Sequence, residues 1–246
     1  MNIHIAKTAE ELGIAAADKA AIIINDCIAK QGHARIVLST GASQFTFLEA
    51  LAQKKVDWSK VEMFHLDEYV DLAESHPASF RLYLRERFLS YAPVRKAHLV
   101  NGEGDVAAHI AELTEEIGKA PIDLALIGIG ENAHIAFNDP PADFDTTVAY
   151  KVVDLDDECK AQQVREGWFE SLATVPTQAI TMSVQQILKS KTIISCVPHQ
   201  VKANAIQKTL QEGITNLIPA SILKSHEDWE LYLDEASASG IDRSNV

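Results

Sequence analysis

The sequence has few cysteines and no long apolar run. Cys27, Cys159 and Cys196 are scattered and show neither the pairing of a disulfide framework nor the spacing of a metal site. We therefore expect reduced structural thiols and no catalytic thiol. No apolar stretch approaches the roughly 20 residues that a membrane span needs, and the first residues lack the charged-then-apolar order of a signal peptide. The sequence thus predicts a cytoplasmic protein with no membrane partner.

Basic residues are also scarce. The chain has 22 lysines and arginines against 35 acidic residues, which gives a formal net charge of -13. Because no basic block or stripe offsets this charge, nucleic acid is not an expected partner. A small anionic ligand remains compatible with the composition, since a few local cations and backbone N–H groups can attract one. Whether copies of the chain form a homo-oligomer is left open.

Strand-like and helix-like segments alternate along all 246 residues without a linker or a repeat. Short apolar runs predict strands at 35–38, 61–66, 97–100, 122–127, 147–153, 179–184, 192–197 and 229–233. Helical periodicity predicts helices at 9–30, 45–54, 75–88, 106–119, 158–172, 199–211 and, as a short turn, 220–224. The alternation indicates a single α/β domain over residues 1–246, with a doubly wound, mostly parallel, Rossmann-like sheet and helices on both faces. Small polar residues after about 236 predict a frayed tail.

The apolar run at 124–127 ends in two glycines, Gly128 and Gly130, and a histidine and a carboxylate follow on a turn-rich segment. Open α/β sheets hold ligands at the carboxyl ends of their strands, which predicts that His134 lies at the mouth of a site. If the chain turns, Asp139 can reach the second ring nitrogen and make the imidazole a general acid or base. A loop histidine bonded to backbone fits this stretch equally well.

Two groups of cofactor are not expected. The glycine pair lacks the third glycine and the helix start of a dinucleotide fingerprint, which disfavours a nicotinamide cofactor. No His, Cys or Glu cluster has the spacing of metal ligands, so no catalytic metal is predicted.

Three further features could serve a small anionic substrate. Adjacent residues of an extended chain point to opposite sides, so only one of Asp67 and Glu68 can face a given site, where a carboxylate could take a proton next to a carbonyl. The small-residue loop between the strand at 35–38 and the next helix suits a phosphate; it comprises Ser39, Thr40, Gly41, Ala42 and Ser43. Lys202 and Arg165 could each neutralise that phosphate. A helix cap, a plain turn and surface charges explain the same residues.

As a set, these residues resemble the glucosamine-6-phosphate deaminase (isomerase) family. The matching segments follow in family order at 39–41, 64–70, 76–80, 128–130, 134–138 and 202–203. The Asp-Glu-Tyr-Val and His-Ile-Ala-Phe-Asn blocks are specific together, whereas the glycine turns are not. The resemblance implies a Rossmann-like fold and the cofactor-free conversion of a 2-amino-2-deoxyhexose 6-phosphate into a ketose 6-phosphate and ammonia.

The resemblance also implies roles for single residues. Asp67 would move a proton between C2 and C1 of the open sugar, and His134 would open the ring with Asp139 and Asn132 beside it. The phosphate would rest on the loop at 39–43 with Lys202 and Arg165. Glu68 and Gly130 complete the expected substrate site.

The chain departs from the family pattern at the catalytic loop. Family members usually carry Asp-Gly-His and then Asn-Glu-Pro, whereas this chain has Asn132, Ala133 and His134, followed by Asn138 and Asp139. The lost carboxylate and the shorter acid predict either a variant with the same function or an isomerase for another sugar, such as galactosamine 6-phosphate. The segment 141–151 lacks the serine and arginine residues that bind an N-acetylated effector in regulated members, so no such site is expected.

Two other functions compete with this interpretation. A lactonase of the 6-phosphogluconolactonase type shares the Gly-x-Gly-x-x-x-His turn but lacks the two specific blocks. A non-catalytic sugar-phosphate sensor would normally need a DNA-binding segment, and this acidic chain has no basic recognition helix.

Overall fold

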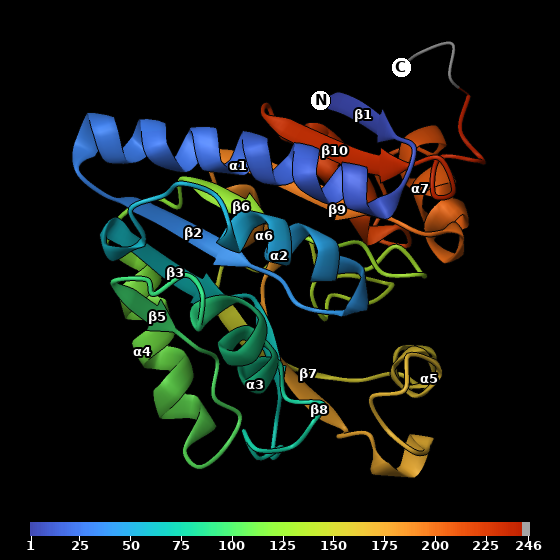
Figure 1. The fold of residues 1–246 in the computed structure, drawn as a ribbon. Helices are drawn as coiled ribbons and strands as arrows, with labels where there is room; N and C mark the ends of the chain where they lie inside the picture. The colour runs from blue at the N-terminus through green and yellow to red at the C-terminus, as the bar shows by residue number, and fades with distance from the viewer. Residues whose placement is uncertain (243–246) are drawn as a thin grey trace.

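The computed structural model describes residues 1–242 and has a seven-stranded parallel sheet at its centre (Figure 1). Every pair of neighbouring strands in this sheet is parallel. In sheet order the strands are β1 (Asn2–Ala6), β10 (Trp229–Asp234), β9 (Thr192–Val197), β6 (Leu124–Leu126), β2 (Ala34–Leu38), β3 (Val61–His65) and β5 (Lys96–His98). The predicted α/β class with a mostly parallel sheet is therefore confirmed.

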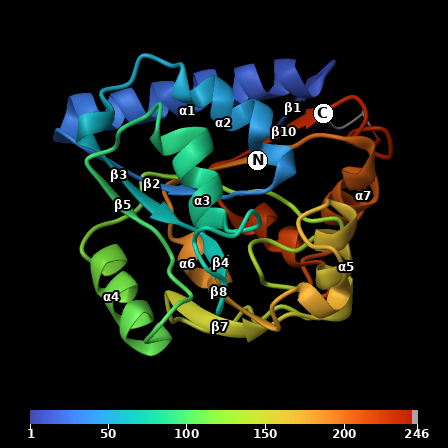
Figure 2. The ribbon, with the colours of Figure 1, turned by 60° about the horizontal axis from the view of Figure 1, so that its bottom comes forward.

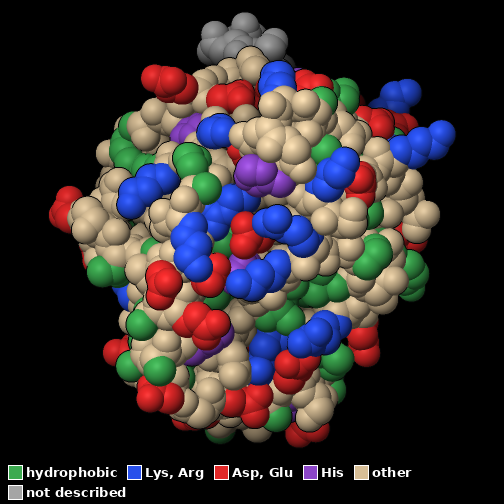
Figure 3. All heavy atoms as spheres, turned by 90° about the vertical axis from the view of Figure 1, so that its left-hand side faces the viewer, with side chains coloured by type: hydrophobic (Ala, Val, Ile, Leu, Met, Phe, Trp, Pro, Cys, Tyr) green, Lys and Arg blue, Asp and Glu red, His purple; other side chains and the backbone are tan. Residues whose placement is uncertain are grey.

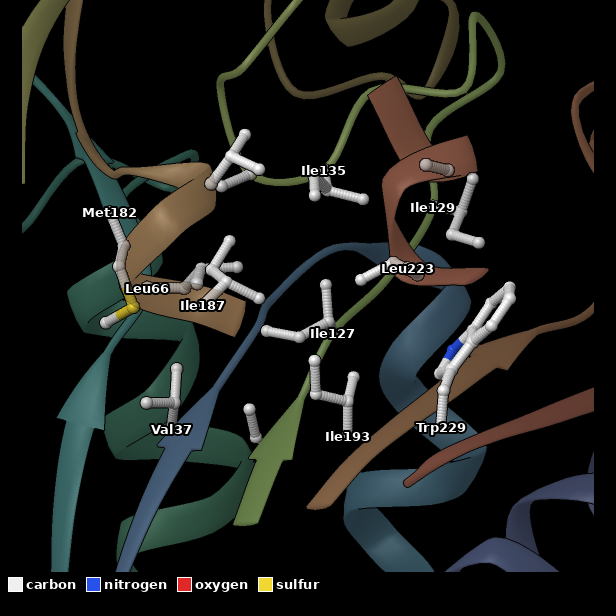
Figure 4. Packing of buried hydrophobic residues seen from close by; sticks show 14 of the residues in the cluster. Val37, Leu66, Ile127, Ile129, Ile135, Met182, Ile187, Ile193, Leu223 and Trp229 are labelled. Carbon is white, nitrogen blue, oxygen red and sulfur yellow. The ribbon is translucent and has the colours of Figure 1, made fainter. Parts of the chain in front are cut away.

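Helices cover both faces of this sheet (Figure 2). One face carries α1 (Ala9–Gln31), α2 (Phe45–Ala52) and α3 (Phe80–Leu84), and the other carries α4 (Val106–Gly118), α6 (Val184–Leu188) and α7 (Ala203–Gln211). Successive strand residues point to opposite faces, so Ile36 and Leu38 pack under the first group while Val37 packs under the second. Figure 4 shows the second core, in which Val37 of β2 and Ile193 of β9 lie on the same face as Ile127, which follows β6.

A second, smaller sheet is the main departure from the predicted single sheet. β4 (Asp67–Tyr69), β8 (Gln178–Met182) and β7 (Tyr150–Asp154) form an antiparallel sheet in the order β4-β8-β7. The predicted strands at 147–153 and 179–184 exist but pair here instead of in the main sheet. Leu66 joins the two sheets, since its N–H donates to Leu38 and its carbonyl accepts from Met182. The chain therefore carries Asp67 directly past the carboxyl edge of the main sheet.

Several predicted helix ends were wrong, and local geometry explains each. The helix expected at 75–88 begins only at Phe80, where the Ser79 side chain accepts from Leu82 N, and continues beyond α3 as a π-helical turn at Arg85–Leu89. The helix expected at 158–172 is α5 (Asp157–Arg165), which ends before Gly167 at a positive φ of 81°. His199 has a φ of 81°, outside the helical region, so the helix expected from 199 starts instead as a 3₁₀ turn at Gln200–Lys202 before α7.

The chain ends also differ from expectation. β1 was not predicted, because this short edge strand has only partly buried side chains. Ser237 and Ala238 are fully buried, although fraying was expected after about 236; residues 243–246 lie outside the described residues. None of the helices within 1–242 is long and apolar enough to cross a membrane.

Candidate active site

A cavity opens at the carboxyl ends of the central strands. Four connections that are distant in sequence meet there: the loop after β2, strand β4, the loop after β6 and the turn before α7. Helix α5 adds a further wall. The lining residues are Ser39, Thr40, Gly41, Ala42, Ser43, Leu66, Asp67, Phe80, Gly128, Ile129, Gly130, His134, Ala136, Phe137, Gln162, Gln163, Glu166 and Lys202. Most of the residues predicted for the site are thus brought together by the fold.

The loop at 39–43 connects β2 to α2 through the 3₁₀ turn Ala42–Gln44. Gly41 has a φ of 105°, a conformation that favours glycine, and its carbonyl accepts from the Tyr83 hydroxyl at 3.0 Å. The buried Gln44 amide donates to the Cys196 carbonyl at 3.0 Å and ties the loop to β9. The Ser39 Oγ is buried at the cavity without a hydrogen-bond partner among the described residues. The loop therefore holds an unused hydroxyl beside a helix N-terminus, a setting that suits an anion.

Lys202 is the cation of the cavity. It is only 5% exposed, and within residues 1–242 its ammonium forms no ion pair. Burial lowers its pKa, while the charges of Glu166 and Glu131 act in the opposite direction. Arg165 lies elsewhere: it does not line the cavity, and its Nη2 is 2.8 Å from Glu131 Oε2 on the surface. A buried ammonium without a counterion is a ready binding partner for a phosphate.

The side chains of Asp67 and Glu68 point to opposite sides of β4, as the alternation of a strand requires. Asp67 lines the cavity at 6% exposure, and within the described chain its carboxylate has no hydrogen-bond or ion-pair partner. Burial, together with the charge of Glu68, raises the pKa of Asp67 to about 8.

Glu68 does not line the cavity, contrary to its predicted place in the substrate site. Its carboxylate is fully buried and accepts hydrogen bonds from the Ser79 hydroxyl and from the backbone N–H groups of Phe80 and Arg81. The Arg81 guanidinium lies 3.3 Å away. Glu68 therefore anchors the N-terminus of α3, a stabilising position for an anion.

His134 and Asp139 meet in the loop after β6. Asp139 Oδ1 lies 3.0 Å from His134 Nδ1, and both side chains are largely buried, with 12% and 13% of their surface exposed. The contact is short but not aligned as a hydrogen bond. Burial alone would raise the pKa of Asp139, but His134 and the Asn132 amide hold it below its usual value. The pair has the composition of an imidazole oriented by a carboxylate.

Asn132 supports this pair without lining the cavity. Its Nδ2 donates to Asp139 Oδ1 at 3.1 Å, and its Oδ1 accepts from the His134 backbone N–H at 3.1 Å. An aspartate at this position could accept from the His134 backbone N–H but could not donate to Asp139. Only the amide can make both hydrogen bonds. The adjacent Ala133 has a φ of 67°, in the left-handed region that favours glycine.

Gly130 is required by the approach of His134. A Cβ at this position would lie 2.3 Å from the ring Nε2, far inside any real contact. The imidazole therefore rests on the backbone of the glycine turn. Only a residue without a side chain permits this arrangement.

Sequence reasoning missed the contribution of α5. Gln162, Gln163 and Glu166 line the cavity, and Gln162 Nε2 donates to Glu166 at 2.7 Å. A pair of uncharged polar residues on a helix carries no local sign of a site, because only the tertiary fold brings that helix over the carboxyl edge of another sheet. The burial of both glutamines within an otherwise polar helix is evident only from the structure.

One group of potential metal ligands lies away from the cavity. Glu62, His98 and Glu116 place ligand atoms within 4.8 Å of one another. Arg35 Nε is 2.9 Å from Glu62 Oε2, so a guanidinium already neutralises this group. The three cysteines are free thiols.

The family model for "Glucosamine-6-phosphate isomerases/6-phosphogluconolactonase" matches residues 7–232. The chain belongs to this family. A glucosamine-6-phosphate deaminase of Lactobacillus delbrueckii subsp. bulgaricus is 31% identical over 240 residues, covering 97% of this chain and 99% of the relative. One of Streptococcus agalactiae is 36% identical over 211 residues, covering 85% and 89%.

Solved structures of the family have the same fold. A monomeric glucosamine-6-phosphate deaminase aligns with a TM-score of 0.89 at 29% identity, and the alignment covers 98% of this chain and 100% of the deaminase. A 6-phosphogluconolactonase of Shewanella baltica aligns with a TM-score of 0.79 at 20% identity, covering 95% and 97%. At that identity the lactonase likeness speaks for the fold alone.

Proposed function

We propose that this chain converts a 2-amino-2-deoxyhexose 6-phosphate, glucosamine 6-phosphate in the first place, into a ketohexose 6-phosphate and ammonia. The observation that carries the proposal is the unpaired Asp67 carboxyl, which lies in one cavity with the loop at 39–43, Lys202 and His134. The relatives that bear the deaminase name support the substrate class, because they match the chain over most of its length.

The phosphate would bind where the cavity is ready for an anion. Lys202 supplies the charge, and the loop supplies the Ser39 hydroxyl and the N-terminus of α2. This anchors C6 and directs the other end of the sugar toward Asp67 and His134. Arg165 and Glu68 do not contact the substrate in this scheme.

Ring opening would use His134. The imidazole takes the proton of the anomeric hydroxyl and returns it to the ring oxygen as the C1–O5 bond breaks, leaving a C1 aldehyde. Asp139 lies against the ring Nδ1, and Asn132 bonds both Asp139 and the His134 backbone N–H, which fixes the loop that carries the ring. Since the same nitrogen accepts and then donates, the step needs no net proton.

The carbon chemistry would use Asp67. Its carboxylate takes the proton from C2, which is acidified by the neighbouring carbonyl, and a neutral cis-enolamine forms as the C2 ammonium of the sugar gives one proton to the C1 oxygen. Asp67 then delivers its proton to C1, so C1 is reduced while C2 becomes an imine. Water adds to C2 and ammonia leaves, giving the C2 ketone. The sequence is redox-neutral overall and consumes one water.

The test follows both products. Purified protein is incubated with glucosamine 6-phosphate or galactosamine 6-phosphate, and ammonia and ketose 6-phosphate are measured; hydrolysis of 6-phosphogluconolactone is measured in parallel. The proposal expects equal amounts of ammonia and ketose, with glucosamine 6-phosphate the better substrate. Lactone hydrolysis without ammonia from either amino sugar would refute it.

A further inference from the structure

The amide of Gln163 is held in one orientation at the cavity. The Tyr69 hydroxyl donates to Gln163 Oε1 at 2.8 Å, and the two residues are 0% and 6% exposed. A side-chain amide has one oxygen and one NH₂ group, so this bond leaves the NH₂ as the donor. Within residues 1–242 nothing accepts a hydrogen bond from Gln163 Nε2, although the residue lines the cavity.

Tyr69 is fixed in turn by its strand and by aromatic packing. It lies two residues after Asp67 on β4, so the two side chains share a face of the small sheet. Its ring packs against Phe80, Phe137 and Phe169, with centroids 5.0 to 5.4 Å apart. Burial raises the pKa of Tyr69 well above its ordinary value, so the hydroxyl keeps its proton and remains a donor.

The neighbouring polar groups of α5 are already satisfied. Glu166 accepts from Gln162 Nε2 at 2.7 Å and from the Trp168 indole at 3.1 Å. The Gln163 NH₂ is therefore the donor on this wall that is free for a ligand. With the phosphate at the loop and C2 at Asp67, the part of the sugar left to meet this wall carries the hydroxyls of C3 and C4.

We propose that Gln163 is a specificity-determining residue that donates from Nε2 to the C3 or C4 hydroxyl of the sugar, and that Tyr69 is the positioning residue that aims this amide. The inference rests on the proposed function. Because glucosamine and galactosamine 6-phosphate differ at C4, a donor on this wall senses the sugar's stereochemistry. A buried donor left without its acceptor rejects an analogue more strongly than a lost apolar contact does.

The test compares kcat/KM of six proteins: wild type, Gln163→Leu, Gln163→Glu, Tyr69→Phe, the double variant of Gln163→Leu with Tyr69→Phe, and the control Tyr91→Phe. Each is assayed with glucosamine 6-phosphate and with its 3-deoxy and 4-deoxy analogues. Loss of one hydrogen bond predicts a decrease of about tenfold for Gln163→Leu on the parent sugar and no decrease on the analogue that lacks the bonded hydroxyl. Gln163→Glu, which keeps the shape and the Tyr69 contact but replaces the donor by an acceptor, should lose at least as much.

Tyr69→Phe tests the positioning role. It should lower kcat/KM severalfold in the wild-type background and have no further effect in the Gln163→Leu background. Tyr91→Phe, at a hydroxyl on a 63% exposed side chain outside the cavity, serves as the matched control. Equal losses on all three sugars, or additive losses in the double variant, would overturn the inference alone. Absence of wild-type turnover on every amino-sugar phosphate would instead refute the proposed function.

Discussion

The polar side chains at the amino ends of strands β2 and β3 are paired with one another, whereas those at the carboxyl ends are not. At the amino ends, Arg35 donates to Glu62, and His98 Nε2 lies 2.7 Å from the same carboxylate. Burial alone would raise the pKa of Glu62, but hydrogen bonds from His98 and Arg35 hold it below its usual value. Figure 3 shows this side of the molecule, where positive and negative side chains are interspersed.

At the carboxyl ends, the Asp67 carboxyl just after β3 and the Ser39 hydroxyl just after β2 have no partner within the described chain. The same two strands thus pair their polar groups at one end and leave them unpaired at the other. Unpaired buried groups cost stability. We infer that the amino end stabilises the fold, whereas the carboxyl end is kept free for a substrate.

The largest effect is expected at Asp67. Asp67→Asn removes the proposed base and should lower kcat by about 10³-fold, within the range of general acid–base catalysis, while KM changes little because phosphate binding is intact. Ammonia release measures kcat, and calorimetric titration with the ketose 6-phosphate product measures binding. Asp71→Asn, an exposed carboxyl outside the cavity, is the control. Near-normal turnover by Asp67→Asn would remove this residue from the chemistry.

A change at the amino ends of β2 and β3 should lower stability and leave kcat unchanged. Arg35→Met leaves Glu62 buried without its guanidinium and should lower the free energy of unfolding by about 3–5 kcal/mol, because breaking a buried pair leaves an uncompensated charge. Denaturant unfolding measures this. The kcat of the folded variant should not change. Arg95→Met, whose exposed guanidinium is 3.9 Å from Glu62, should cost at most about 1 kcal/mol. A lower kcat with unchanged stability would contradict the division of roles.

Gly130→Ala sharpens the account of His134. The added methyl would overlap the imidazole and must displace it, so kcat should decrease by about 10²-fold with a smaller change in KM. Gly118→Ala, in α4 where a Cβ meets nothing within 4 Å, should leave the kinetics unchanged. Wild-type kcat in the first variant would show that His134 is not held by this contact.

The pH dependence tests the unpaired state of Asp67. Proton abstraction needs the carboxylate, and the pKa of this group is raised to about 8 by burial and by Glu68. Below that value the carboxylate fraction falls, so kcat/KM should rise about tenfold per pH unit and level off near pH 8. A profile of kcat/KM against pH measures this. A plateau that already begins near pH 5 would contradict an unpaired, desolvated carboxyl.

The smallest effect is on stability. The pKa of the Asp67 carboxyl rises from 3.8 to about 8 on folding. Its contribution to the free energy of unfolding is therefore fully present below pH 4 and is lost as the pH rises to 8. Asp67→Asn should therefore be more stable than wild type at pH 8, by about 2 kcal/mol, and not at pH 4. Thermal unfolding at both pH values measures the difference. A variant less stable at pH 8 would mean that Asp67 is paired in the native protein.

Local pattern predicted most of the strands, the start of α1 at Ala9 and the glycine turn at His134, because each depends on neighbours in sequence. It also anticipated that Asp67 and Glu68 face opposite sides. It could not predict that Glu68 is bound by α3, or that β4, β7 and β8 leave the main sheet, since both depend on pairing between distant segments. The role of Gln163 was out of reach for the same reason: its orientation is set by a tyrosine 94 residues away.

The most direct test of the central claim uses glucosamine 6-phosphate carrying deuterium at C2. Proton transfer by Asp67 predicts a ketose 6-phosphate whose deuterium is at C1 or lost to solvent, one ammonia per ketose, and a rate slowed by the isotope. Asp67→Asn should release neither the label nor ammonia. Ammonia released with the deuterium still at C2 would mean that the amine leaves without proton abstraction, and would contradict the account.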